Sequence, residues 1–317
     1  MTSPRSALIS LDVTPYYHCV ARCVRRAFLC GKDKETGRSF DHRKTWLVQR
    51  IQLLGNVFAI NIAAYAVMSN HYHLVLHVDT CRSEEWSHEE VINRWNRLYR
   101  GPELVKRFTL GETLSETELE IVHRTVEKWR SRLSNISWFM SCLNYYIALN
   151  ANKEDGCKGR FWEGRFNSKA LLDDAALLSC MAYVDLNPIR AGIADSLDAS
   201  AFTSIQDRIR VIKGQGNPDT PSLMTFAASA TKPQQTTNLP YKLKDYIDLV
   251  DWTGRAIRDD KKGYIKATQP SLLKALGLSA QQWQILTLQI QKKSICMLHG
   301  LNKLQTMKKQ NSQSMAA

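Results

Sequence analysis

The N-terminal part of the chain alternates between the two-residue hydrophobic period of strands and the longer period of a helix. Residues 13–24 predict a strand, and apolar residues recur at helical spacing over residues 43–54, where Gly55 is placed to end the helix. Residues 57–64 and 65–78 predict further strand. A strand, a helix and more strand predict an α+β sandwich with a mainly antiparallel sheet.

The segment 65–78 is rich in β-branched, aromatic and aliphatic residues and is interrupted only at the turn formers Ser69 and Asn70. Because side chains two apart in a strand point the same way, His71, His73 and His77 share one face. Two neighbouring imidazoles form half of a divalent-metal site. A surface or packing pair of histidines has the same pattern, so the spacing alone leaves both interpretations open.

The composition changes over residues 79–134, which predict two amphipathic helices. Ser87 with Glu90 and Ser115 with Glu118 have the capping-box pattern, and apolar residues that step by three and four follow each of them. We expect this segment, at about residues 80–134, to be a helical insertion that covers one edge of the sheet.

Two segments after the insertion carry candidate chemistry. A helix predicted over residues 136–152 contains Tyr145 and Tyr146, which are possible nucleophiles in a pattern typical of core. In residues 158–169 cations alternate with aromatic rings, which suits phosphate contacts and base stacking. A short strand with arginine stems lying along it is the alternative. The cations are Arg160, Arg165 and Lys169, and the rings are Phe161, Trp162 and Phe166.

The next predicted helix, with Asp173 or Asp174 as its N-cap, runs to about residue 186. Pro188 disfavours a helical conformation at the residue before it, so the helix is expected to end there. Tyr183 and Asn187 are four residues apart and therefore lie on one face of the helix.

Together, these residues can form a chemical site. Tyr183 is a candidate phenolic nucleophile, and the amide oxygen of Asn187 can join His71 and His73 around Mg²⁺ or Mn²⁺. The alternative is that Tyr183 packs in the core and Asn187 caps the helix.

The charge of the chain favours a polyanionic partner. The 317 residues carry 43 Lys and Arg against 30 Asp and Glu, a net charge of +13, and nucleic acid is the commonest such partner. The eight cysteines form no Cys-x-x-Cys pair, and no signal peptide or 20-residue apolar run is present. A reducing cytoplasm is the expected location.

The C-terminal third divides by composition. Residues 1–210 form the main predicted domain, and residues 211–240 resemble a linker rich in Gly, Pro, Ser, Thr and Gln. Residues 241–317 predict a helical extension, with a helix at 242–258 and a helix–Gly–helix pattern that begins at Pro270 and continues to about Leu298. Residues 305–317 are expected to be disordered.

Three segments occur in order along the chain: Met68-Ser69-Asn70-His71-Tyr72-His73-Leu74, Gly159-Arg160-Phe161-Trp162-Glu163-Gly164-Arg165-Phe166 and Tyr183-Val184-Asp185-Leu186-Asn187-Pro188-Ile189-Arg190-Ala191-Gly192. Together they resemble the single-tyrosine HUH transposases, the insertion-sequence-200-like group, and within it the branch of REP-associated tyrosine transposases. The resemblance covers about residues 13–195 without the insertion, and it implies a ferredoxin-like or RRM-like fold.

The resemblance also implies a role for each matching residue. His71 and His73 would bind the divalent metal, Asn187 would complete the metal site, and Tyr183 would attack DNA. The implied activity is cleavage and rejoining of hairpin-bearing single-stranded DNA through a 5′-phosphotyrosine intermediate, in a bacterial cytoplasm, by a monomer or a homodimer. The side chains expected to contact DNA are Arg160, Arg165, Lys169 and Arg190.

Other functions remain open at this point. A domesticated nuclease that processes repeats in its host genome would keep the same chemistry. A catalytically inactive nucleic-acid-binding regulator would keep the basic charge but not the reaction. A plasmid relaxase or replication initiator shares the HUH chemistry, and the Asn-Pro-Ile-Arg segment favours the transposase branch.

Overall fold

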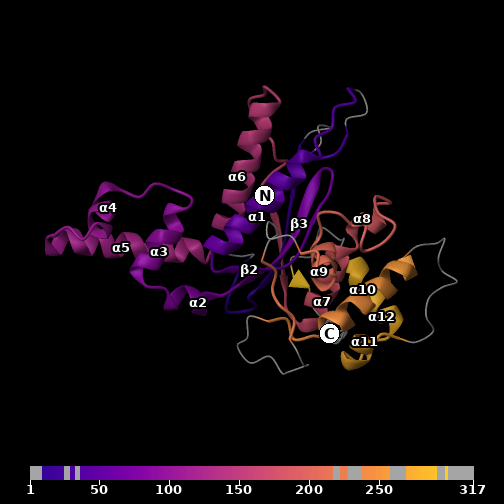
Figure 1. The fold of residues 1–317 in the computed structure, drawn as a ribbon. Coiled ribbons are helices and arrows are strands. Elements are labelled where there is room, and N and C mark those ends of the chain that lie inside the picture. The colour runs from indigo at the N-terminus through magenta and orange to yellow at the C-terminus, as the bar shows by residue number, and fades with distance from the viewer. Residues whose placement is uncertain are drawn as a thin grey trace, which may run out of the picture.

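The fold is built on a twisted sheet with helices on both faces (Figure 1). The structure is a computed structural model, and it describes residues 9–24, 29–32, 36–216, 222–227, 238–257, 269–290 and 297–298. Within these residues the strands lie in the order β2-β3-β1-β4-β5. Their bounds are Tyr16–Arg22 for β1, Ile60–Val67 for β2, His71–Val78 for β3, Asn167–Leu171 for β4 and Met297–Leu298 for β5.

The first four strands are antiparallel to their neighbours, and β5 adds a short parallel edge. The main helices of the sandwich are α1 (His42–Val57), between β1 and β2, and α6 (Ile136–Glu154), between β3 and β4. This β-α-β-β-α-β order with β1 and β3 central is the ferredoxin-like arrangement. The predicted α+β fold class is therefore confirmed.

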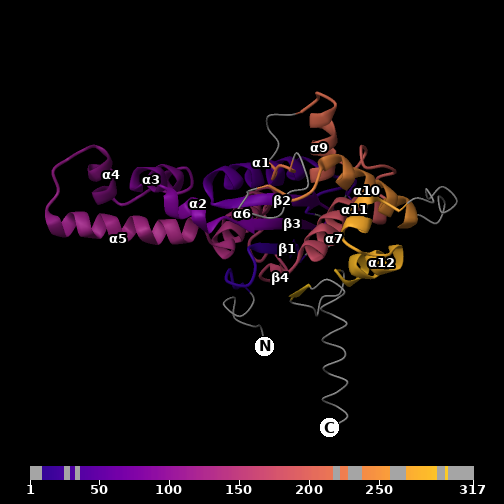
Figure 2. The same ribbon diagram turned by 90° about the horizontal axis from the view of Figure 1, so that it is seen from below.

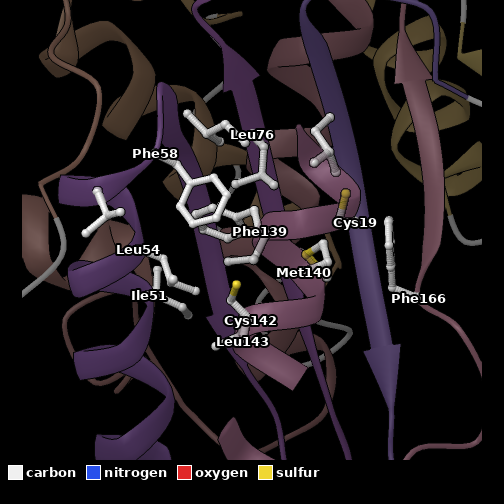
Figure 3. Packing of buried hydrophobic residues seen from close by; sticks show 14 of the residues in the cluster. Cys19, Ile51, Leu54, Phe58, Leu76, Phe139, Met140, Cys142, Leu143 and Phe166 are labelled. Carbon is white, nitrogen blue, oxygen red and sulfur yellow. The ribbon is translucent and has the colours of Figure 1, made fainter. Parts of the chain in front are cut away.

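The larger core lies between the sheet and the pair α1 and α6. Alternation along the strands sends Tyr17 and Cys19 of β1, and Leu74 and Leu76 of β3, to this face. Figure 3 shows Ile51 and Leu54 of α1 meeting residues of α6 there, with Phe58 in contact with Phe139 at 5.4 Å between ring centres. Buried apolar side chains of this kind contribute roughly 1.5–3 kcal/mol each, so this face anchors the sheet.

Two local predictions about this region are wrong. Gly55 does not end the first helix, because α1 continues to Val57. A Cβ at residue 55 would lie 3.1 Å from Ile62 Cδ1, so the glycine lets the helix pack closely on β2. The segment 65–78 is not one strand: β2 ends at Val67, and a hairpin at 68–70 reverses the chain, closed by the Met68 N–H donating to His71 O at 2.9 Å.

The insertion forms an arm that projects away from the sheet in both views (Figures 1 and 2). Within the continuously described residues 36–216 it contains four helices, not the two expected: α2 (Thr80–Glu85), α3 (His88–Asn96), α4 (Glu103–Thr109) and α5 (Glu116–Leu133). Ser87 and Ser115 cap α3 and α5 as predicted. Trp95 and Trp129 stack within the arm at 5.0 Å between ring centres, and Trp95 lies 6.1 Å from Trp138 of α6, which joins the arm to the core.

The opposite face of the sheet is covered by helices from the second half of the chain. A second core joins Val75 of β3 to α7 (Asp174–Asp185), α10 (Leu243–Ile257) and α12 (Ala280–Gln289). The remaining helices are α8 (Asn187–Arg190), α9 (Ser204–Ile212) and α11 (Ser271–Ala275). The helix predicted at 242–258 and the Gly277 turn, with φ +64°, are confirmed, whereas α12 ends at Gln289.

The segment predicted as a linker lies partly against the sheet. The Met224 N–H donates to Ile62 O at 2.9 Å, so the chain pairs with β2 at Leu223. Residues 305–317, predicted to be disordered, lie outside the described residues. No helix in the described part of the chain is both long enough and apolar enough to cross a bilayer.

Candidate active site

The two histidines of the His-x-His pair lie at the end of β3 near the hairpin. In the antiparallel register with β1, His71 is opposite Arg22 and His73 is opposite Val20. Because side chains alternate, both imidazoles lie on the face of the sheet that α7 covers, away from the α1 and α6 core. The sequence prediction that they share a face is confirmed.

Each histidine has a neighbour at its Nδ1 atom. His71 Nδ1 is 2.6 Å from Asn70 Oδ1, and His73 Nδ1 is 3.0 Å from His18 Nε2. His73 Nε2 is buried and has no hydrogen-bond partner among the described residues. Burial is the main cause that lowers the pKa of His71 to about 4 and the pKa of His73 well below its usual value. Both imidazoles are therefore neutral near pH 7 and can offer a lone pair to a cation.

Tyr183 is brought to these histidines by α7. The helix begins after Asp173, whose side chain accepts from the Ala176 N–H, as the N-cap prediction required. Tyr183 lies in the last turn of the helix, and its ring centre is 5.6 Å from that of His73. An early strand and a late helix thus converge on one point, as the sequence hypothesis needed.

Asn187 lies one turn beyond Tyr183, at the point where α8 begins with Pro188 in its first turn. Its Nδ2 donates to Tyr183 O at 2.9 Å. That bond uses the amide nitrogen, so it does not consume the amide oxygen, which is the atom a divalent cation prefers.

A buried carboxylate fixes the end of α7. Asp185 accepts hydrogen bonds from the Ser204 hydroxyl, from the Ile205 N–H at 3.0 Å and from the Tyr246 hydroxyl. These donors come from α9 and α10, so three helices are tied together between Tyr183 and Asn187. The position of Tyr183 therefore depends on the C-terminal half of the chain.

Burial and nearby polar groups act in opposite directions on the phenol. Burial raises the pKa of Tyr183 above its usual value, while the positive charge of Arg190, a hydrogen bond from the Asn187 side chain and, more weakly, the charge of Arg22 lower it. Arg190 Cζ lies 5.5 Å from the centre of the Tyr183 ring. The guanidinium groups thus favour the phenolate that a nucleophilic attack requires.

The site is closed on the inside and open at one edge. Tyr183 is 9% exposed, His73 is 5% exposed and Asn187 is 8% exposed. Arg22 is exposed, and His71 and Arg190 are partly exposed. A polyanionic substrate would therefore approach along the edge where the two arginines lie.

Fewer side chains of the segment 158–169 are exposed than its alternation of cations and aromatic rings indicated. Arg160 and Arg165 are exposed, but Lys169 is 9% exposed, and its Nζ donates to Ile290 O at 2.6 Å. The aromatic rings of this segment pack in the larger core instead of facing solvent. They are Phe161, Trp162 and Phe166.

Sequence reasoning did not single out His18 or Arg22 as site residues. Both lie on β1, on the face shared with Val20, and the antiparallel pairing with β3 brings them to the histidines. The available signal was the alternation within residues 16–22, which places every second side chain on one face. Using it required the strand pairing and register, which the sequence pattern does not specify.

The donor atoms present fit a divalent cation. Imidazole nitrogens and an amide oxygen are ordinary ligands for such ions, and an unpartnered buried nitrogen is otherwise unfavourable. Among the described residues, no group of three or more His, Cys, Asp and Glu forms a metal-binding cluster. The predicted set of His71, His73 and Asn187 contains only two residues of those types, because its third member is an amide.

Comparisons with known proteins add little to this geometry. No family model matches the chain, and no curated protein matches its sequence. One solved structure that resembles it is a REP-associated tyrosine transposase bound to a REP hairpin, with 12% sequence identity and a TM-score of 0.36. The match covers 69% of this chain and 93% of the other. A likeness this distant assigns no role to any residue of this chain.

Proposed function

We propose that this chain is a divalent-metal-dependent tyrosine transposase that cleaves and rejoins single-stranded DNA bearing hairpins. The single observation that supports this most is the 5.6 Å separation between the rings of Tyr183 and His73, whose buried Nε2 has no hydrogen-bond partner in the described part of the chain. Simple core packing of a tyrosine on two histidines does not explain why a buried nitrogen has no described partner. It also does not explain the two arginines at the open edge of the site.

The cation would be held by His71, His73 and the amide oxygen of Asn187. When bound, it would polarise the scissile phosphate and orient it for attack. Neutral imidazoles suit this role, since protonated ones could not bind a metal.

Tyr183 is the proposed nucleophile. Its phenol loses a proton to solvent, and the phenolate oxygen forms a bond to the phosphorus. The bond from phosphorus to O3′ breaks, and the departing O3′ takes up a proton to give a 3′-hydroxyl. The phosphodiester is conserved as a 5′-phosphotyrosine, so attack by another 3′-hydroxyl rejoins DNA and releases the phenol without an external energy source. Arg190 and Arg22 stabilise the phenolate before attack.

The test looks for DNA that is covalently linked to the protein. The protein is incubated with single-stranded hairpin oligonucleotides and Mn²⁺, denatured, and run on a gel that separates free from protein-linked DNA. Tyr183→Phe should abolish the linked band while DNA binding remains. The matched control is Tyr145→Phe, which removes the same hydroxyl from an exposed tyrosine on α6 and should leave the band intact. Adduct formation by Tyr183→Phe would refute the assignment, and binding without any adduct in the unaltered protein would favour a regulator.

A further inference from the structure

His18 lies behind the proposed metal site and takes no part in the reaction described above. It is 2% exposed, and its Nε2 is 3.0 Å from His73 Nδ1, in a pair whose ring centres are 5.2 Å apart. The outer nitrogens of the pair, His18 Nδ1 and His73 Nε2, are both buried without a hydrogen-bond partner among the described residues.

One proton decides what His73 can bind. A neutral imidazole carries hydrogen on one nitrogen and a lone pair on the other. If His73 Nδ1 donates to His18 Nε2, the lone pair of His73 lies on Nε2, the atom for which the described residues provide no partner. If His18 donates instead, His73 Nε2 carries the hydrogen and cannot bind a cation.

His71 shows the same arrangement with a different partner. Its Nδ1 lies 2.6 Å from Asn70 Oδ1, and an amide oxygen can only accept, so Nδ1 carries the hydrogen and Nε2 carries the lone pair. In a matching arrangement at His73, His18 would act as the acceptor. His71 and His73 would then both carry the lone pair on Nε2, where a cation can bind.

Resting on the function proposed above, we propose that His18 is a positioning residue that accepts the Nδ1 hydrogen of His73 and keeps its Nε2 ready to bind a divalent cation. His18 does not touch the cation. It fixes the tautomer and the ring orientation of the residue that does, which is how hydrogen-bond partners behind metal-binding histidines generally raise metal affinity.

The first test measures binding of Mn²⁺ alone, without DNA, by the electron paramagnetic resonance signal of the free ion. His18→Leu, which keeps the apolar volume but has no acceptor, should weaken Mn²⁺ binding by about 10–100-fold. His18→Gln places an amide oxygen near the position of Nε2 and should restore most of the affinity. His77→Leu is the matched control: His77 is on β3 like His73 and on the same face, its Nδ1 is 3.2 Å from Asn61 Nδ2, and Mn²⁺ affinity should not change.

The outcomes separate this inference from the proposed function. Unaltered protein that does not bind Mn²⁺, or a His73→Ala variant that binds it normally, would overturn the function and this inference with it. Mn²⁺ binding that needs His73 but is unchanged in His18→Leu would overturn only the role of His18. Urea unfolding of each variant identifies a loss of affinity that merely follows a loss of structure.

The second test reads the tautomer directly and needs no metal. Two-bond proton–nitrogen spectra of ¹⁵N-histidine-labelled protein distinguish hydrogen on Nδ1 from hydrogen on Nε2. His73 should carry its hydrogen on Nδ1 in the unaltered protein and in His18→Gln, and on Nε2 in His18→Leu. Hydrogen on Nε2 of His73 in the unaltered protein would overturn the proposal.

Discussion

Replacing Arg190 with glutamine should slow covalent attack by Tyr183 through charge alone. Arg190 Cζ lies 5.5 Å from the centre of the phenol ring, and its charge lowers the pKa that burial raises. At that distance a unit charge stabilises a phenolate by about 0.8 kcal/mol at the dielectric constant of water and about 3 kcal/mol at an effective constant of 20. Arg190 is partly exposed, so we take a value near the lower limit, about 1 kcal/mol.

A loss of about 1 kcal/mol raises the phenol pKa by roughly 0.7 unit, and the phenolate fraction near neutral pH falls about fivefold. A more basic phenolate is also a better nucleophile, so fivefold is the upper limit of the expected loss. The assay is single-turnover adduct formation at saturating oligonucleotide with Mn²⁺. At saturating oligonucleotide the rate does not depend on DNA affinity. Any contribution of Arg190 to DNA affinity therefore appears in the oligonucleotide concentration needed to saturate the protein.

Two further variants separate the effect of the charge from the other effects of the substitution. Arg190→Lys keeps the charge and should retain most of the rate, whereas Arg97→Gln, an equal change of charge on the exposed arm, should not alter the saturated rate. If Arg190→Lys is as slow as Arg190→Gln, the charge is not the cause. If Arg190→Gln changes only the DNA concentration for saturation, Arg190 binds the substrate and does not activate Tyr183.

Three other outcomes are expected. The adduct rate of the unaltered protein should rise with pH between about 6.5 and 9, because the raised pKa of Tyr183 keeps the phenol protonated at neutral pH and the fraction of phenolate increases as pH rises. A rate that falls over this range would contradict this expectation. His71→Ala should abolish Mn²⁺-dependent cleavage as a chelator does, and cleavage that survives both treatments would remove the metal site. Asp185→Ala removes the acceptor of three buried donors, so it should lower the free energy of unfolding by about 4 kcal/mol, measured by urea titration. The control Asp248→Ala, at an exposed residue of α10, should change it little.

Local pattern was sufficient for much of the fold. The alternation in residues 71–78, the Ser115 capping box and the N-cap at Asp173 each predicted an element that the structure contains, because each signal acts within a few residues. Gly55 gave the wrong helix end because glycine serves both to end helices and to allow close packing. Only the neighbouring strand β2 shows that Gly55 serves the second purpose. Ser69 and Asn70 mark the hairpin at 68–70, but the same two turn formers also occur at an irregularity within a single strand, so the local pattern does not show that the chain reverses.

The candidate site was partly predictable for the same reason. Tyr183 and Asn187 are four apart on a helix, so their proximity follows from local geometry, and the structure gives a hydrogen bond between them. His18 and Arg22 depend on which strand pairs with β3 and in which register, and one residue of slip would turn both to the other face. The burial of Lys169 depends on α12, more than a hundred residues later in the chain.

The C-terminal helices have a closer relation to the chemistry than their place in the chain indicates. α10 and α12 both contact α7, and Tyr246 of α10 donates to Asp185, two residues after Tyr183. Gly254 approaches the end of α7 so closely that a Cβ there would lie 2.9 Å from Leu186 Cδ2. Ser204 of α9 is also bonded to β2, where its Oγ accepts from the Tyr65 N–H at 3.0 Å. Moving Tyr183 away from His73 of its own chain would therefore take the Ser204 and Ile205 donors from the buried Asp185, at a cost of several kcal/mol. The structure therefore holds the phenol against the histidines of the same chain, and the helices that follow it in sequence maintain that position.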